Sequence, residues 1–512
     1  MKIWYQIGKI LLTIYLYCIS YFYTLSVPLS WTTPVRLVVI YGVVHIVCGW
    51  LSEQQLTLYK KSHKKNWKMG VTVFGIIVLI LGTYYIAYYP GGLMIDTFNQ
   101  WYQVQKGCLL DWHPAIHTFL FLKLPSLLIN NLAFVNFLQI IWLALAGTYL
   151  GMVLESWGVN RWLICGLTAF GFVQPASAII LSFCWKDTAM TIFVLVLSAQ
   201  VVEIFCSEGE WLKIWYHPVL FGLFSALTAL VRHNAVLLVG PVMVMVVLCY
   251  WKQIRYYCLL GCVWTLVFAA GIKGPLYHVL KVENHPQVSA EMLGVPMTIL
   301  GNVLIHEPDS LDPECREFLY KIGDQEMWEE NYQEGNWNSA KWMGDDISND
   351  VIEEEGTGKV LTYTLHAIQK EPYYAYRAVV KLFSVVWQPA GTKVEWKYHV
   401  YVQPDNGYGY ETTGVPALQG ILDAWRKLSQ KGPVFMTWGW YTGFYILLMA
   451  FFGISRLRTE GRKLLLWIPI LCYNFGTALL LCGFDFRFFS FNTVVTFLML
   501  PVIMGKQKRE EE

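Results

Sequence analysis

The stretch YYPGGLMIDTFNQWYQVQKGCLLDWHPAIHTFLF, residues 88–121, joins an apolar segment to a polar loop. An apolar run at 69–89 leads into it, and about 20 apolar residues are enough for one helix to cross a bilayer. The Pro-Gly-Gly sequence at 90–92 then ends this helix, and acidic and histidine side chains follow it. The stretch therefore predicts a membrane helix that opens into a polar loop just outside the bilayer.

Composition assigns the whole chain to the polytopic membrane proteins. Of its 512 residues, 55% are hydrophobic and only 14% are charged, which is too apolar for a water-soluble surface. We expect an all-α protein with about 12 transmembrane helices and an external soluble domain. The expected spans are 8–27, 34–51, 69–89, 132–153, 162–183, 188–206, 214–231, 234–251, 256–276, 434–455, 464–482 and 488–505.

Basic residues in the connecting loops predict the orientation in the membrane. Three basic clusters flank the expected spans, and the positive-inside rule puts all three in the cytoplasm together with both termini. The same count puts the loop around Lys252 and Arg255 inside. Because these charges are spread over loops and form no single basic face, the sequence predicts no nucleic-acid partner. The clusters are Lys60, Lys61, Lys64, Lys65 and Lys68; Arg456, Arg458, Arg462 and Lys463; and Lys506, Lys508 and Arg509.

Residues 281–432 differ abruptly from the rest in composition. They are rich in Asp, Glu, Gly, Asn and Pro, and they have the length of an ordinary domain. An amphipathic stretch at 361–387 predicts helices that break at Pro372. The chain thus divides into two N-terminal helices with a basic loop, 1–68; a membrane core, 69–280, with an external loop at 90–131; the external domain, 281–432; and C-terminal helices with a tail, 433–512.

Two smaller expectations concern the external parts. Residues 113–131 are apolar but are interrupted by Lys123 and Pro125, so we expect a helix lying at the outer interface. Cys108 and Cys315 are the cysteines expected outside the spans on that side, which allows one disulfide without requiring it.

The polar residues next to the spans gather on one side of the predicted topology. Lysine and arginine normally avoid tight external turns, and burying an unpaired cation near the bilayer costs on the order of 3 kcal/mol. Converging cations therefore predict an anionic ligand such as a lipid-borne phosphate or pyrophosphate, whereas each cluster taken alone could serve only as an interfacial anchor. The clusters are Asp96, Asp111 and His113 in the loop 90–131; Lys186 and Asp187 in SFCWKDTAM; Arg232, His233 and Asn234 in ALVRHNAVL; and Asp485 and Arg487 in GFDFRFFSF.

Asp96 is the best single candidate for chemistry. A carboxylate beside an apolar wall can act as a general base toward a hydroxyl while cations opposite stabilise a phosphate leaving group; its alternative role is a helix cap. His113 could bind a divalent metal with Asp111 or Asp96, or make a structural hydrogen bond before Pro114. Three aromatic residues could stack on sugar rings, although an interfacial aromatic belt is favoured for them: Trp101, Tyr102 and Trp112.

These residues resemble a known superfamily. A membrane helix that runs into an external loop with an early Asp, followed by further spans and an outer domain, is similar to the GT-C glycosyltransferases. PGGLMIDTFNQW with DWHPAIHTFL, then WKDTAM, LVRHNAVL and DFRFF, resembles bacterial multispanning proteins placed beside the family 39, protein-mannosyltransferase-like enzymes. The resemblance implies that the acid of the first external loop, Asp96 by position, is the catalytic base or a metal ligand. Paired acids or Asp-x-Asp, common in that loop, are absent, and two extra spans precede it.

Together these features predict a cell-envelope transferase of polysaccharide biosynthesis. It would move a sugar from a polyprenyl-phosphate donor to a cell-surface glycan or lipid-linked acceptor, on the outer face of a bacterial plasma membrane. The alternative is a transporter or flippase for a lipid-linked saccharide, and a third possibility is a non-catalytic scaffold for envelope assembly. A transporter should carry polar residues at mid-bilayer depth and broken helices in corresponding halves, whereas the polar residues here crowd one face.

Overall fold

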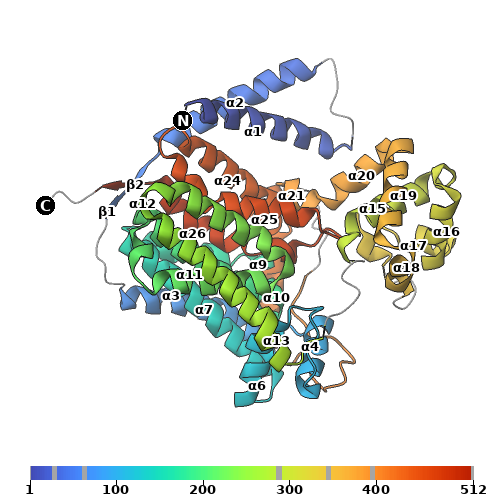
Figure 1. The fold of residues 1–512 in the computed structure, drawn as a ribbon, viewed down its shortest axis with the longest axis horizontal. Coiled ribbons are helices and arrows are strands. Elements are labelled where there is room, and N and C mark those ends of the chain that lie inside the picture. The colour runs from blue at the N-terminus through green and yellow to red at the C-terminus, as the bar shows by residue number, and fades with distance from the viewer. Residues whose placement is uncertain are drawn as a thin grey trace.

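A computed structural model describes residues 2–25, 32–59, 66–283, 291–341, 347–391 and 398–508, and it is helical almost throughout. The described part contains one short two-stranded sheet, so the prediction of an all-α protein is confirmed. Figure 1 shows a large helical bundle, a helical hairpin above it and a smaller helical unit beside it.

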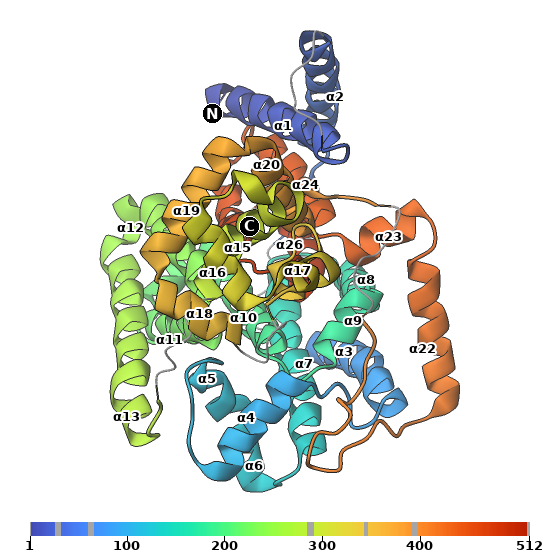
Figure 2. The same ribbon diagram turned by 90° about the vertical axis from the view of Figure 1, so that its right-hand side faces the viewer.

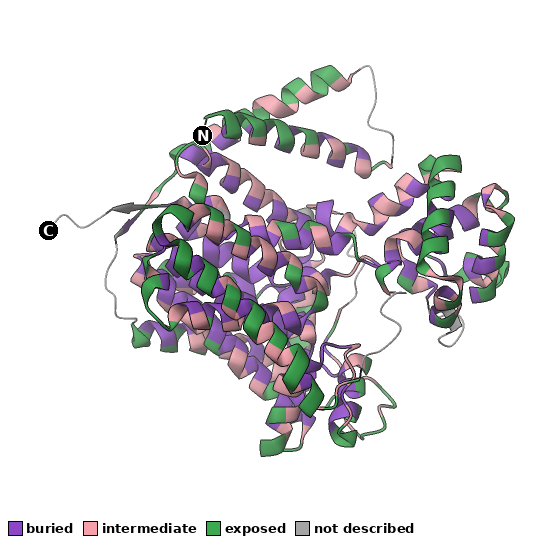
Figure 3. Cartoon of the chain, in the orientation of Figure 1, coloured by how far each residue is buried: buried purple, intermediate pink, exposed green. Residues whose placement is uncertain are grey.

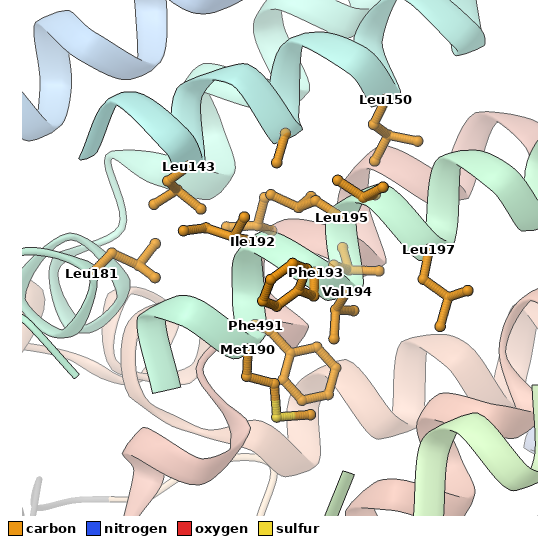
Figure 4. Close-up of a cluster of buried hydrophobic side chains, with 14 of the residues drawn as sticks. Leu143, Leu150, Leu181, Met190, Ile192, Phe193, Val194, Leu195, Leu197 and Phe491 are labelled. Atoms are coloured by element: carbon orange, nitrogen blue, oxygen red, sulfur yellow. The ribbon is translucent and has the colours of Figure 1, made fainter. Parts of the chain in front are cut away.

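The centre of the bundle is α10 (Lys186–Cys206), whose side chains are buried on nearly every face. A helix that is apolar all round belongs in the interior, because no face of it gains from contact with water. Around it pack α7 (Leu132–Ser156), α11 (His217–Val231) and α26 (Asn492–Met504), and α3 (Trp67–Ala87) packs on α7. Figure 4 shows part of this core, in which Leu143 and Leu150 of α7 and Ile192, Phe193 and Leu195 of α10 belong to one cluster of buried side chains. In Figure 3 the buried residues concentrate in this bundle.

Judged by helix length, the structure has fewer membrane crossings than the twelve that the sequence predicts. Within the described ranges, seven helices are long and apolar enough to cross a membrane, or up to nine if each of two bent pairs is one crossing. The bent pairs are α8 (Arg161–Phe172) with α9 (Pro175–Leu181), at 76°, and α23 (Pro433–Trp440) with α24 (Thr442–Arg456), at 89°. The protein is therefore polytopic and helical, and the count of twelve stays a prediction. The expected spans 214–231 and 464–482 correspond to shorter helices, α11 and α25 (Ile468–Ala478).

The long helix α12 (Val236–Gly271) is two helices joined at a kink. Ile254 has a non-helical backbone, with φ −141° and ψ 34°. Met243 Sδ lies 3.7 Å from Cys262 Sγ and 3.9 Å from Thr265 Oγ1. Because residues this far apart along one straight helix cannot touch, the two halves fold back on each other. The helices expected at 234–251 and 256–276 are both present, with the turn near Arg255, and the count of seven takes them as one helix.

The described members of the three basic clusters lie near one end of the bundle. Strand β1 (Leu56–Tyr59) pairs in parallel with β2 (Gly505–Lys508). Lys463 Nζ donates to the Gly505 carbonyl, and Arg456 Nη2 donates to the Leu51 and Gln54 carbonyls at 2.7 and 2.6 Å. The two Arg456 bonds satisfy carbonyls at the end of α2 (Thr33–Glu53), which pairs with α1 (Lys2–Phe22). Lys60, Lys61, Lys64, Lys65 and Arg509 fall outside the described residues.

A separate helical unit follows the membrane core and has its own apolar centre. Its core includes Phe318, Trp328 and Trp337, and Figure 2 shows the unit facing the viewer. Pro372 begins a new helix, as the sequence predicts. The unit consists of α15 (Gly294–His306), α16 (Pro313–Ile322), α17 (Gln325–Asn331), α18 (Ile347–Glu355), α19 (Thr357–Lys370) and α20 (Pro372–Leu382).

The last part of the region 281–432 lies against the bundle and not in this unit's core. Helix α22 (Pro416–Ser429) packs on α3, and Gln419 Nε2 donates to the Ala87 carbonyl at 2.7 Å. Of residues 113–131, which are expected as an interfacial helix, residues 115–128 are helical, with a π-helical middle at Thr118–Lys123. All 12 cysteines fall within the described residues and are free, so Cys108 and Cys315 are not bonded.

The remaining elements are short connectors or carry site residues. They are α4 (Ile95–Lys106), α5 (Ala115–His117), α6 (Leu124–Leu128), α13 (Tyr277–Val279), α21 (Ser384–Trp387), the π-helices η1 (Thr118–Lys123) and η4 (Ile272–Leu276), and the 3-10 helices η2 (Glu210–Lys213), η3 (His233–Ala235), η5 (Pro308–Ser310), η6 (Trp337–Ser339), η7 (Gly461–Leu466) and η8 (Phe486–Phe489).

Candidate functional site

Helix direction brings the predicted polar clusters together. Helix α3 begins after β1, and α26 ends at β2, so both have one end at the basic side of the bundle. Their other ends lead to Asp96 and Arg487. Because Arg487 contacts Asp96 and also packs against Trp185, the turn before α10 lies at the same place. Arg232, which follows α11, completes the cluster through its contact with Phe488.

The backbone before Asp96 is held between two distant segments. Gly92 N donates to Ser182 O at 3.0 Å, and Leu93 N donates to Tyr401 O at 3.1 Å. Gly92 has room only for hydrogen, because a Cβ there would lie 2.3 Å from the Phe183 ring. This pairing fixes the start of α4, in which Asp96 is in the first turn and is not the N-cap residue. The helix-cap alternative for Asp96 is therefore wrong.

Asp96 forms an ion pair with Arg487. Asp96 Oδ2 lies 3.2 Å from Arg487 Nη1, and the two side chains are 28% and 24% exposed. Arg487 is also paired with Asp485, since its Nε lies 2.8 Å from Asp485 Oδ2 and its backbone N–H donates to Asp485 Oδ1 at 3.0 Å. Tyr398 OH donates to the same Asp485 Oδ1. One cation thus connects two carboxylates in a partly exposed position.

Electrostatics keep Asp96 ionised. Burial alone would raise the pKa of Asp96, but the neighbouring Arg487, His113 and Lys186 outweigh it and lower the pKa to about 2. At neutral pH the group is a carboxylate that can accept hydrogen bonds. A carboxylate with so low a pKa is a weak base for as long as Arg487 stays on it.

Lys186 and His113 form a second part of the site, in which a cation faces a neutral imidazole ring. Lys186 Nζ lies 3.3 Å from His113 Nδ1. Burial, reinforced by the charge of Lys186, lowers the pKa of His113 to about 3. His113 is therefore neutral at pH 7, and its Nδ1 can accept from the lysine. Among the described residues, no carboxylate forms an ion pair with Lys186, so its charge is the least compensated of the predicted phosphate ligands.

Arg232 is already neutralised by its neighbour in space. It forms a buried ion pair with Asp187, and its Nε donates to Asn234 Oδ1 at 2.8 Å. Its guanidinium lies over the Phe488 ring, 4.2 Å from the centroid. Asn234 in turn donates to Thr477 Oγ1 at 2.9 Å. Arg232, Asp187 and Asn234 thus form a buried network next to the partly exposed pair.

Asp111 and Asp96 have different partners. Its Oδ1 accepts from the Ala115 backbone N–H at 2.9 Å and from Tyr277 OH at 3.4 Å, and its Oδ2 lies 3.6 Å from Lys273 Nζ. His233 Nε2 lies 3.1 Å from the Asp111 backbone carbonyl. These contacts hold the loop and the start of α5.

The possible metal set Asp96, Asp111 and His113 is not assembled. Across the residues that the structure describes, no three His, Cys, Asp or Glu side chains are grouped so as to hold a metal ion. Instead, Asp96 faces Arg487, Asp111 faces Lys273, and His113 faces Lys186.

The aromatic residues of the first loop divide by exposure. Trp101 is buried, with 3% of its surface exposed, so it cannot stack on a sugar; Tyr102 is exposed, and Trp112 is half-buried. The sequence missed the role of Trp185 and Tyr398, which pack on and anchor the Arg487 pair. Trp185 is next to Lys186 in the sequence, and this position could have indicated that it belongs to the site. The sequence around Tyr398 contains no such indication.

Comparison with models of protein families, with curated proteins and with solved structures returned no match.

Proposed function

We propose that this chain is a membrane glycosyltransferase of the GT-C type. It moves a sugar from a polyprenyl-phosphate donor to an acceptor hydroxyl on a cell-surface glycan or lipid-linked acceptor, at the outer face of a bacterial plasma membrane. The observation that carries the proposal is the meeting of one carboxylate, Asp96, with Lys186 and Arg487 where both ions of the Asp96–Arg487 pair remain partly exposed. The transfer needs a base for the acceptor hydroxyl and cations for the donor phosphate, placed close to one another.

Each group has a defined part in the proposed reaction. The acceptor hydroxyl loses its proton to Asp96 while its oxygen bonds to the sugar's anomeric carbon. The bond from that carbon to the phosphate oxygen breaks, and its electron pair stays on the phosphate. Lys186, held by neutral His113, and Arg487 stabilise the charge that appears there. Arg232 is neutralised by Asp187 and contacts the site through the Phe488 ring, and it does not hold the donor itself.

Replacing Asp96 with Asn tests the reaction. Asn keeps the size and most hydrogen bonding but removes the basic carboxylate, so transfer should slow by about 10² to 10⁴ while carrier binding persists. The measurement is the sugar content of the surface glycan in cells with matched expression. Asp309→Asn is the control, because Asp309 lies exposed in the outer unit. Unchanged sugar content in the Asp96→Asn cells would rule out Asp96 as the base.

A transporter for a lipid-linked saccharide is the second candidate, and one observation favours it. The bent pairs α8–α9 and α23–α24 meet at their bends, where Gln174 Nε2 donates to the Trp438 carbonyl at 3.2 Å. Broken helices that meet in this way are frequent in transporters. However, Gln174 is fully buried and satisfies backbone carbonyls at the break. A transporter would deliver the intact lipid-linked saccharide, whereas the transferase releases carrier phosphate without sugar, so assaying the released lipid separates the two.

A further inference from the structure

Arg487 is anchored on one side and shared on the other. Asp485 holds its backbone N–H and its Nε, and Tyr398 OH in turn holds Asp485. Only the far Nη1 reaches Asp96, at the longer distance of 3.2 Å. The anchor on Asp485 therefore does not depend on Asp96, and the contact with Asp96 can be given up without releasing the arginine.

Aromatic rings keep the guanidinium in place. Its central carbon lies 5.2 Å from the centroid of the Trp185 ring and 5.3 Å from that of Phe488. A guanidinium is attracted to the face of an aromatic ring at this distance, so both rings help to hold it. Arg487 and Asp96 remain partly exposed, so a ligand arriving from outside the bundle reaches the Nη edge that Asp96 now occupies.

We propose that Arg487 is exchanged between Asp96 and a lipid-linked phosphate, so that donor binding frees Asp96 to accept the acceptor's proton. The inference rests on the proposed function and adds its regulation: the base becomes effective only when the donor is present. Without donor, the Asp96–Arg487 pair keeps the carboxylate unreactive toward a stray hydroxyl or water.

Charge conservation supports the exchange. The site holds three cations, Lys186, Arg232 and Arg487, and three carboxylates, Asp96, Asp187 and Asp485, but both Asp96 and Asp485 pair with Arg487. The donor is a phosphodiester with one negative charge, and the released carrier is a monoester that gains a second. Asp96 loses its charge in the same step, because it takes the acceptor's proton. The positive charge of Arg487 thus compensates Asp96 before the donor binds, and it compensates the phosphate from donor binding until the carrier leaves.

The groups facing Asp96 account for the change in its basicity. Arg487 comes from η8, Lys186 from the start of α10 and His113 from the loop before α5. Lys186 stays beside neutral His113 throughout, so the contact that changes is the one with Arg487. Losing that contact returns the pKa of Asp96 toward the ordinary value of about 4, which makes it a better base.

A double-mutant cycle on donor-phosphate binding tests the exchange. The probes are a polyprenyl phosphate in lipid nanodiscs and inorganic phosphate, and the full-length protein is used throughout. If phosphate competes with Asp96 for Arg487, Asp96→Asn should bind the lipid phosphate about tenfold more tightly than the parent. In an Arg487→Ala background the same substitution should change affinity by less than about twofold, because the contested cation is gone. Arg316→Ala with Asp309→Asn, an exposed pair in the outer unit, is the matched control cycle.

The outcomes separate this inference from the proposed function. An equal effect of Asp96→Asn in both backgrounds would overturn the exchange while leaving a lipid-phosphate site standing. Equal affinity for inorganic phosphate and the lipid phosphate would argue against a lipid-linked donor, yet the cycle would still support exchange. No binding of either probe to the parent protein would overturn both. Unaltered thermal stability of Arg487→Lys, with weakened coupling in the cycle, would show that Arg487 acts on the ligand and not on the fold.

Discussion

Arg232 stands in a buried ion pair, and its removal should destabilise the protein more than it weakens a ligand. The side chains of Arg232 and Asp187 are 7% and 2% exposed. Arg232→Ala leaves the Asp187 carboxylate buried without its partner near the start of α10. Breaking a buried pair by removing one member costs about 3–5 kcal/mol of folding free energy.

Two further variants test the predicted loss of folding free energy in Arg232→Ala. Arg316→Ala removes the arginine from an exposed pair with Asp309, whose side chains are 34% and 96% exposed, and should cost less than about 1 kcal/mol. The double variant Arg232→Met with Asp187→Leu replaces both charges by apolar groups, so it should recover most of the loss seen in Arg232→Ala.

The assay is equilibrium unfolding in mixed micelles of dodecyl maltoside with increasing sodium dodecyl sulfate, followed by tryptophan fluorescence. The expected order of stability is parent, Arg316→Ala and the double variant close together, with Arg232→Ala well below them. If Arg232→Ala unfolds at the same detergent fraction as Arg316→Ala, the buried pair does not hold α10 to the turn after α11, and the reasoning fails.

Two further predictions concern acid stability and topology. Burial lowers the pKa of His113 from the ordinary 6.5 to about 3, so at this residue the unfolded chain binds one more proton between these pH values. His113 should therefore contribute a fall in stability of about 1.4 kcal/mol per pH unit on acidification through that window, measured by unfolding at pH 4 to 7. His113→Gln should remove this contribution, whereas the control His278→Gln, at an exposed position, should leave the slope unchanged. An equal slope in His113→Gln would refute this. Single cysteines that replace Tyr102 and Glu354, both in the parts expected outside, should react with an impermeant thiol reagent in intact cells, whereas a cysteine that replaces Arg255 should not. Labelling of the cysteine at position 255 from outside would reverse the assigned orientation.

The gathering of the site could be predicted from the sequence because it follows from helix direction. Hydrophobic length and the positive-inside rule are enough to assign Asp96, Lys186, Arg232 and Arg487 to one side. The fold of the unit after residue 291 could not be predicted in the same way, since its helices are short and its core comes from many separate segments.

The pairing of charges within the site could not be predicted. Lys186 and Asp187 are neighbours in sequence, yet residues one apart on a helix point about 100° apart, so Asp187 turns inward to Arg232 while Lys186 turns to His113. The tyrosine that anchors Asp485 lies 87 residues before it. Such partners depend on tertiary packing, and no local pattern around Tyr398 marks them.

The pairing of Leu93 with residues 401–403 also determines how late in synthesis the loop before Asp96 can reach its final structure. Leu93 donates to Tyr401 O and accepts from Gln403 N, and the two segments are separated by most of the membrane core and the outer unit. Roughly 300 residues lie between them, which a ribosome working at about 5–20 residues per second needs about 15 to 60 s to make. The loop that carries Asp96 therefore spends that interval without one of its backbone partners. The loop gains this pairing only after translation has passed Gln403, and Arg487, the ion-pair partner of Asp96, is made later still.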